Sequence, residues 1–216
     1  MFPAPDRFNV KICGLTRADQ ALAIAQMGPA ALGLNFWPQS KRYIAPPSAA
    51  EWAPDLRSLT TLVAVLVNPP PALPVELIER QIVDVFQLHG DETPDDCERM
   101  MGLNLPVIKA LQVRDRASLA QIGDYPCETI LLDSYNPGLY GGEGKSFPWE
   151  LAAEAQQRFP EKRFILAGGL TPENVAEAIS QVHPCGVDVA SGVESAPGIK
   201  ALDMVRRFIA AAMGTT

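Results

Sequence analysis

The sequence predicts an α/β fold, a single (β/α)8 barrel domain covering residues 1–216. Short apolar segments alternate with alanine-rich or charged helical segments along the whole chain, and eight such pairs can be counted. Several apolar segments lack a polar face, which is typical of parallel strands covered by helices. Eight units fit 216 residues only if the loops are short. An open, doubly wound sheet is the alternative, because periodicity alone does not show closure.

The predicted strands follow β-branched and aliphatic runs, of which residues 62–67 and 164–167 are apolar on both faces. Side chains alternate along a strand, so Lys11 and Cys13 are expected on one face and Val10 and Ile12 on the other. Strands are expected at residues 8–13, 31–36, 61–67, 83–88, 106–111, 128–133, 163–167 and 186–190.

The predicted helices fill the intervals between these strands. Thr16 is expected to cap the first helix, which would begin near Arg17. The 20 prolines and 16 glycines fall mostly in the connections, where they mark turns. Helices are expected at residues 17–27, 48–57, 74–81, 93–101, 115–121, 147–158, 172–181 and 199–212.

The chain is acidic, with a formal net charge of −7 and a sequence pI near 4.9. Nucleic acids and anionic membranes require a concentrated basic surface, so neither is expected as a partner. A small molecule is the expected partner. The sequence leaves open whether the protein is a monomer or a homodimer.

The apolar runs and the cysteines of the sequence bear on where the protein is located and whether it binds a metal. No apolar run approaches the roughly 20 residues that span a bilayer, and the start lacks the order of a secretory signal. The four cysteines are widely spaced without a CxxC motif, and there are only two histidines. Neither a zinc site nor a disulfide framework is indicated. We therefore expect a cytoplasmic protein with reduced thiols and no metal.

Two glycine turns, Gly168-Gly169 and Ser191-Gly192, follow the seventh and eighth predicted strands. Glycines let backbone N–H groups approach a phosphate, and a phosphate site after these strands is common in barrels. Either turn alone could be ordinary, with Thr171 as a helix N-cap and Pro172 in the first turn. Both turns at consecutive strand ends favour a phosphate site.

Two further strand ends carry groups suited to acid–base chemistry. Cys13 ends the first strand, and Lys11 on the same face could favour the thiolate that a base requires. Asp133 ends an apolar strand, where burial would favour a protonated acid. A buried small hydrophobe and a solvated carboxylate are the respective alternatives. The two strands are three steps apart around an eight-strand ring, so the groups would face each other across the mouth.

Three other polar features lie in the predicted rim loops. Arg42 stands near Trp37 and Tyr43 and could bind a carboxylate in bidentate fashion, or could be a solvated arginine. His89 is a candidate substrate contact, although it could equally be a strand-end histidine, and we assign it no catalytic role. Residues 140–146 lack the spacing of a Walker phosphate loop and are interpreted as a rim loop that closes over ligand.

Taken together, segments along nearly the whole chain resemble the phosphoribosylanthranilate isomerase family, whose members are (β/α)8 enzymes of tryptophan biosynthesis. No single segment is diagnostic, but the combination and its order are. The matching segments are KICGLT (11–16), FWPQSKRY (36–43), VNP (67–69), QLHGDE (87–92), LLDS (131–134), GGEGKSF (141–147), LAGGL (166–170) and VDVASGVE (187–194).

The resemblance implies roles for individual residues. The family's general base falls on Cys13 and its general acid on Asp133. Its contact to the anthranilate carboxylate falls on Arg42, and its phosphate-binding loops fall on Gly168, Gly169, Ser191 and Gly192. The implied reaction is an Amadori rearrangement, which needs no metal or organic cofactor because an iminium intermediate is the electron sink. Two positions depart from the family pattern, Glu143 where a small hydroxyl residue is usual and Ala190 where serine is frequent.

Three other functions are compatible with a barrel of this kind but fit the residues less well. A related phosphosugar isomerase of histidine biosynthesis resembles the chain less, because its first strand ends in an aspartate where this chain has Cys13. A metal-dependent sugar-phosphate epimerase is disfavoured by the shortage of histidines at strand ends. A catalytically silent barrel that binds a phosphorylated ligand would keep the glycine turns and would not need an acid and a base.

Overall fold

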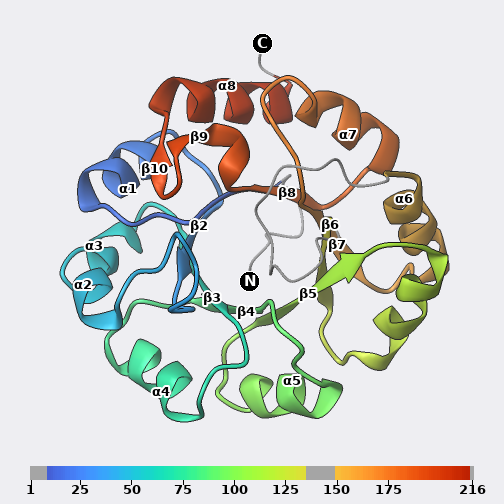
Figure 1. The fold of residues 1–216 in the computed structure, drawn as a ribbon, viewed down its shortest axis with the longest axis horizontal. Helices are drawn as coiled ribbons and strands as arrows, with labels where there is room; N and C mark the ends of the chain where they lie inside the picture. Colours follow the sequence, from blue (N-terminus) through green and yellow to red (C-terminus); the bar gives the residue numbers. More distant parts are fainter. Residues whose placement is uncertain (1–8, 135–148, 215–216) are drawn as a thin grey trace.

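In the computed structural model, eight parallel strands form a closed barrel surrounded by helices, and the structure describes residues 9–134 and 149–214 (Figure 1). The strands follow one another around the ring in chain order, and β8 pairs with β1 to close it. This architecture confirms the predicted (β/α)8 barrel, also called a TIM barrel, and excludes the open sheet.

The strands begin and end within three residues of their predicted positions. They are β1 (Asn9–Cys13), β2 (Ala31–Asn35), β3 (Thr61–Leu66), β4 (Val85–Leu88), β5 (Val107–Val113), β6 (Thr129–Ser134), β7 (Arg163–Leu166) and β8 (Gly186–Val189). All are buried over nearly their full length.

The helices lie outside the ring, between consecutive strands (Figure 1). They are α1 (Ala18–Ala25), α2 (Pro46–Ala50), α3 (Ala53–Leu56), α4 (Ala72–Glu79), α5 (Pro94–Met101), α6 (Trp149–Arg158), α7 (Val175–Val182) and α8 (Leu202–Met213), with the 3-10 helices η1 (Arg116–Asp124) and η2 (Ser191–Val193).

Several sequence-based expectations for the helices are wrong. The helix expected at 48–57 is two short helices, since Pro54 lies in the first turn of α3 and lacks the N–H that a continuous helix requires. The helix expected at 115–121 is the 3-10 helix η1. A two-stranded hairpin, β9 (Glu194–Ala196) and β10 (Ile199–Lys200), precedes α8 where helix was expected from residue 199.

Both proposed threonine caps are also absent. The N-cap of α1 is Arg17, without a side-chain cap, and the Thr16 hydroxyl donates instead to the Gly198 carbonyl at 2.8 Å. Helix α7 begins at Val175 with Asn174 as N-cap, so Thr171 lies outside the helix.

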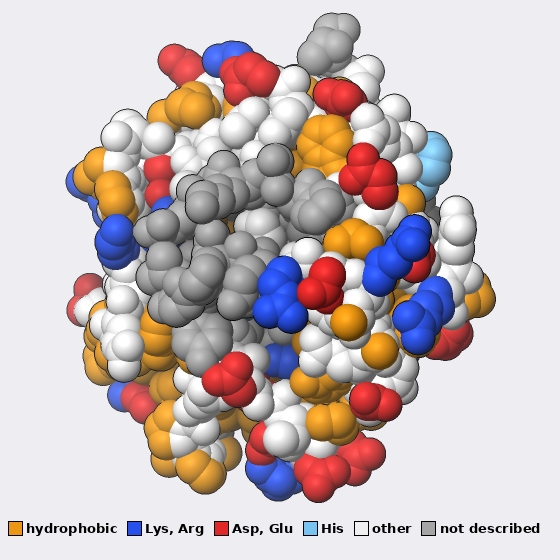
Figure 2. All heavy atoms as spheres, turned by 45° about the vertical axis from the view of Figure 1, so that its right-hand side comes forward, with side chains coloured by type: hydrophobic (Ala, Val, Ile, Leu, Met, Phe, Trp, Pro, Cys, Tyr) orange, Lys and Arg blue, Asp and Glu red, His pale blue; other side chains and the backbone are white. Residues whose placement is uncertain are grey.

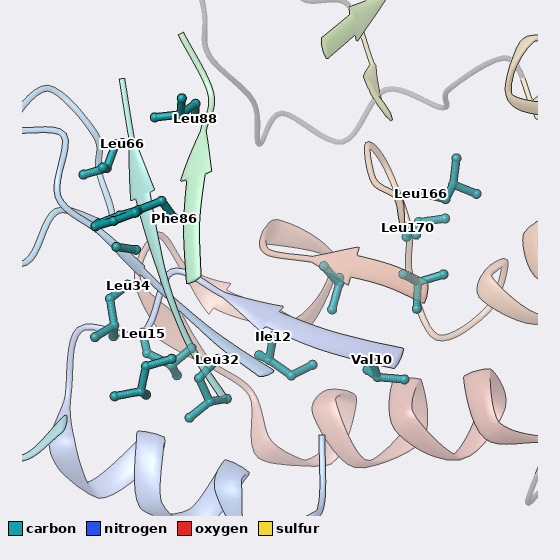
Figure 3. Packing of buried hydrophobic residues seen from close by; sticks show 14 of the residues in the cluster. Val10, Ile12, Leu15, Leu32, Leu34, Leu66, Phe86, Leu88, Leu166 and Leu170 are labelled. Carbon is teal, nitrogen blue, oxygen red and sulfur yellow. The ribbon is translucent and has the colours of Figure 1, made fainter. Parts of the chain in front are cut away.

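The alternation of side chains separates two apolar cores. Val10 and Ile12 of β1 belong to the outer core between the barrel and the helices (Figure 3). A smaller core fills the barrel interior with side chains from six strands: Ala31, Val63, Val85, Ile108, Ala110, Leu131, Ile165 and Ala167. Lys11 and Cys13, on the opposite face of β1 from Val10 and Ile12, therefore point into the barrel, as predicted.

The surface agrees with the acidic composition. On the face shown in Figure 2, acidic and basic side chains are interspersed, without an extended basic area among the coloured residues. Within residues 9–134 and 149–214, no helix is long and apolar enough to cross a membrane.

Candidate active site

One pocket at the carboxyl ends of the strands contains the eight residues predicted to act on or bind the substrate. It is open to solvent at the barrel mouth, and its walls come from strands or loops that follow β1 through β4 and β6 through β8. The predicted residues that line it are Cys13, Arg42, His89, Asp133, Gly168, Gly169, Ser191 and Gly192. The structure thus places them together, and their individual roles stay predictions.

Cys13 is the last residue of β1 and lies beside Gly33 of β2, its register partner. A Cβ atom on Gly33 would lie only 2.7 Å from Cys13 Sγ and 3.0 Å from its Cα. The peptide after Cys13 is held by the same residue, because Gly14 N–H donates to the Gly33 carbonyl at 2.8 Å. The missing side chain of Gly33 therefore makes the space that the thiol occupies.

Charged groups surround this thiol inside the barrel. Lys11 Nζ lies 3.0 Å from Asp188 Oδ2, and their side chains are 1% and 8% exposed. Burial raises the pKa of Cys13 above its usual value; Lys11 and Lys200 oppose this effect, and the Asp188 carboxylate adds to it. Lys11 thus acts on the Cys13 pKa in the predicted direction, but burial and Asp188 outweigh the two lysines.

Asp133 lies near the end of β6 and is nearly fully buried. Its Oδ1 accepts a hydrogen bond from the Ser134 N–H at 2.8 Å, and its Oδ2 lies 3.1 Å from His89 Nε2. Gln87 Nε2 lies 3.0 Å from His89 Nδ1. Because an amide nitrogen donates, this contact leaves the ring proton on Nε2, directed at Asp133.

This chain of contacts was not predicted from the sequence. Gln87 precedes His89 by two residues, so alternation along β4 places both on the inward face. That periodicity was the available signal, but only the fold shows that the histidine meets Asp133 from two strands away.

Arg42 is held by an acidic residue of the same chain. Its Nε and Nη2 donate to the two carboxylate oxygens of Glu194 at 2.8 and 2.7 Å. Lys200 Nζ also donates to Glu194 at 2.7 Å, and the Lys200 side chain is fully buried. Two cations thus share one carboxylate, which leaves one net positive charge at the rim.

This arrangement limits how Arg42 could bind a ligand. Its Nε–Nη2 edge, one of the two that could make the predicted bidentate contact, is occupied by Glu194 in this structure. Among the described residues, none bonds to Nη1 of Arg42, so the outer Nη1–Nη2 edge is the one open to a ligand. Sequence reasoning missed Glu194 because a contact across 152 residues leaves no mark in local spacing. It missed Lys200 because residue 200 was assigned to a helix and not to the β9–β10 hairpin that brings it to Glu194.

The two glycine turns predicted to bind phosphate lie side by side at the pocket wall. Gly168 has a φ of +82°, and a Cβ there would lie 2.6 Å from Ser134 N. A Cβ on Gly192 would lie 1.9 Å from the Leu170 carbonyl oxygen. Glycine is therefore required at both turns for the loops after β6, β7 and β8 to approach one another.

Some predicted features lie outside the described residues. These are the rim loop at 140–146 and its Glu143, which departs from the family pattern. Among the residues that the structure does describe, no cluster of three or more His, Cys, Asp or Glu side chains could hold a metal ion.

Comparisons with known proteins agree with one another. The family model for N-(5'-phosphoribosyl)anthranilate (PRA) isomerase matches residues 10–211. The N-(5'-phosphoribosyl)anthranilate isomerase of Trichlorobacter lovleyi is 47% identical over 201 residues, which cover 93% of this chain and 96% of that protein.

Two crystal structures are similar over nearly the whole barrel. Monomers generated from the dimeric phosphoribosylanthranilate isomerase of Thermotoga maritima give a TM-score of 0.85 at 35% identity, over 96% of this chain and 100% of that one. A phosphoribosylanthranilate isomerase in complex with reduced 1-(o-carboxyphenylamino)-1-deoxyribulose 5-phosphate gives a TM-score of 0.85 at 36% identity, with the same coverage.

Proposed function

Because the chain belongs to the N-(5'-phosphoribosyl)anthranilate isomerase family, we propose that its rim pocket catalyses the Amadori rearrangement of N-(5'-phosphoribosyl)anthranilate. The product is 1-(2-carboxyphenylamino)-1-deoxyribulose 5-phosphate, and the step belongs to tryptophan biosynthesis. The observation that carries the mechanism is the presence of Cys13 and Asp133 in one pocket, on strands that lie three steps apart around the ring.

In the first step, Asp133 acts as the general acid. Its carboxyl proton passes to the furanose ring oxygen, the C1–O bond breaks, and the nitrogen lone pair forms an iminium with C1. The Nε2–H of His89, 3.1 Å from Oδ2, stabilises the carboxylate that remains. The Ser134 N–H stabilises the other oxygen.

In the second step, Cys13 acts as the general base. Its thiolate removes the proton from C2, and the C–H electrons move toward the iminium to give an enolamine. Protonation of C1 and loss of the C2 hydroxyl proton then yield the ketone. The iminium accepts the electron pair, so the chemistry has no need of a cofactor.

Binding groups for the two ends of the substrate flank these residues. The outer edge of Arg42 faces the anthranilate carboxylate, and the net positive charge of the Arg42–Glu194–Lys200 cluster favours an anion there. The turns at Gly168-Gly169 and Ser191-Gly192 receive the phosphate, and their lack of side chains allows the close approach.

The test follows the fluorescence of phosphoribosylanthranilate, generated in place, with purified protein and EDTA. We expect rapid loss of substrate with the wild-type protein. Asp133→Ala and Cys13→Ala should each reduce kcat by on the order of 10²- to 10⁴-fold, which is the usual contribution of a proton transfer. Cys127→Ala, at a buried cysteine outside the pocket, is the matched control and should retain turnover.

Two results would contradict this function. Near-normal turnover in Asp133→Ala or Cys13→Ala would remove the role assigned to that residue. Absence of wild-type turnover, together with tight binding of a reduced product analogue, would instead identify a barrel that binds its ligand without converting it.

A further inference from the structure

A buried ion pair lies next to the candidate site without lining its pocket. Lys109 Nζ lies 2.8 Å from Glu92 Oε2, and the side chains are 1% and 4% exposed. Lys109 is on the outer face of β5, because Ile108 and Ala110 on either side pack in the barrel interior. Glu92 is in the loop that follows β4.

The Glu92 carboxylate holds the backbone of two rim loops. Its Oε1 accepts from Asn68 N–H at 2.7 Å, and its Oε2 accepts from Gly90 N–H at 2.8 Å. Lys109 Nζ donates to the Gly90 carbonyl at 2.7 Å. Gly90 is thus held at both its N–H and its C=O, and the loops after β3 and β4 are joined to β5.

The residue that this clamp immobilises is the neighbour of Gly90, His89. The His89 N–H is bonded to the Leu66 carbonyl of β3 at 2.8 Å, so the backbone is fixed on both sides of the residue. The ring then extends into the pocket and places Nε2 3.1 Å from Asp133.

The free energy of folding does not by itself explain why the Lys109–Glu92 ion pair is buried. Burying two charges removes their hydration, and a well-packed apolar pair of similar volume is often as stable or more stable. Here the charged groups bind backbone atoms of two rim loops, which apolar side chains could not do.

We propose that Lys109 and Glu92 are positioning residues for the reaction, which hold the His89 ring in place and thereby its contact with Asp133. This inference rests on the acid role proposed for Asp133. Neither residue is expected to touch substrate.

The test replaces both charges at once, because removing one would leave the other buried and unpaired. In Lys109→Met/Glu92→Gln, the new amide can accept from only one of the two N–H groups, so the clamp is loosened. We expect kcat to fall roughly 10- to 100-fold, since small misplacements of catalytic groups have effects of this size. KM should change less than about threefold, because substrate binding is retained.

Nitrogen NMR of the histidine rings reports the tautomer of His89, which would stay unchanged if Lys109 and Glu92 had a purely structural role. The chain has two histidines, and the exposed His183 is an internal reference. In the wild type, His89 should show a fixed tautomer with the proton on Nε2. In the double variant its signals should become those of averaged tautomers, while those of His183 stay unchanged.

The matched control is Arg57→Met/Asp84→Asn. This ion pair also binds backbone, at Leu62 N–H, but it lies at the amino ends of β3 and β4. It should leave kcat and the His89 signals unchanged. If Lys109→Met/Glu92→Gln does not fold, Glu92→Asp is the milder variant, because it keeps the charge beside Lys109 but is one methylene shorter and cannot reach both the Asn68 and the Gly90 N–H.

The outcomes separate the two proposals. Wild-type kcat in the clamp variant, or a fall in kcat with unchanged His89 signals, overturns the positioning role. The NMR measurement does not depend on turnover, so it tests the clamp even if the wild-type protein fails to isomerise the substrate.

Discussion

The Cys13 thiol is placed between charges that act in opposite directions. Burial and Asp188 raise its pKa, whereas Lys11 and Lys200 lower it, and burial is the largest effect. A base must be deprotonated to act, so activity should rise with pH through the pKa of this thiol. The raised pKa places this rise above the pH at which an ordinary cysteine titrates.

Substitution of the ion pair next to Cys13 should move this pH dependence in two directions. Asp188→Asn removes a negative charge and should move the rise in kcat/KM to lower pH, and Lys11→Met removes a positive charge and should move it to higher pH. Shifts of about one pH unit are expected for charges at this range. The thiolate absorbance, measured against Cys13→Ala, gives the same titration directly, and shifts in one common direction would contradict the assignment.

At the scale of elements, the packing of β2 against β1 positions the Cys13 thiol. Gly33 is buried, and a Cβ there would lie 2.7 Å from Cys13 Sγ. Gly33→Ala should therefore displace the thiol and reduce kcat by roughly 10- to 100-fold while the barrel still forms. Circular dichroism checks the fold and steady-state kinetics check kcat; a variant that unfolds, or one with unchanged kcat, would refute the explanation.

The strands were predictable because each is a run of apolar residues bounded by turns, and burial on both faces leaves a strong signal. The β9–β10 hairpin was not, since it is short and largely exposed. Cys13, Asp133 and Arg42 could be placed at the rim from their strand ends. The contact between Glu194 and Arg42 could not be assigned, because it joins two loops far apart in the chain. Gln87 could have been, because it lies two residues before His89 and alternation places both on one face of the strand.

For the whole molecule, closure of the ring builds part of the site. Lys11 and Asp188 are register partners where β1 pairs with β8, so the ion pair under the thiol exists only in a closed barrel. The base of the same seam is packed tightly at Gly186, whose register partner is Asn9. The tight packing at Gly186 and the ion pair near the thiol therefore lie on the same two strands, but each can be changed by its own substitution.

Gly186→Ala should weaken this seam with little effect on the chemistry. A Cβ there would lie 2.6 Å from the Asn9 carbonyl oxygen, and backbone cannot move away as a flexible side chain can. We expect the free energy of unfolding to fall by about 1–3 kcal/mol, as overpacking typically causes, and the melting temperature to fall by roughly 2–4 °C per kcal/mol. The kcat of the folded protein should stay near wild type, because Lys11 and Asp188 lie two residues further along the strands.

Gly123→Ala is the control for this substitution, since its Cβ would meet only the Phe159 ring, at 3.2 Å, which can shift. Denaturant unfolding and kcat should be measured on both variants and on Gly33→Ala. If Gly186→Ala lost kcat but kept its stability, the seam would act on the chemistry directly. Loss of kcat without loss of stability in Gly33→Ala, together with loss of stability without loss of kcat in Gly186→Ala, would establish that the carboxyl end of the barrel serves the reaction and the amino end serves closure.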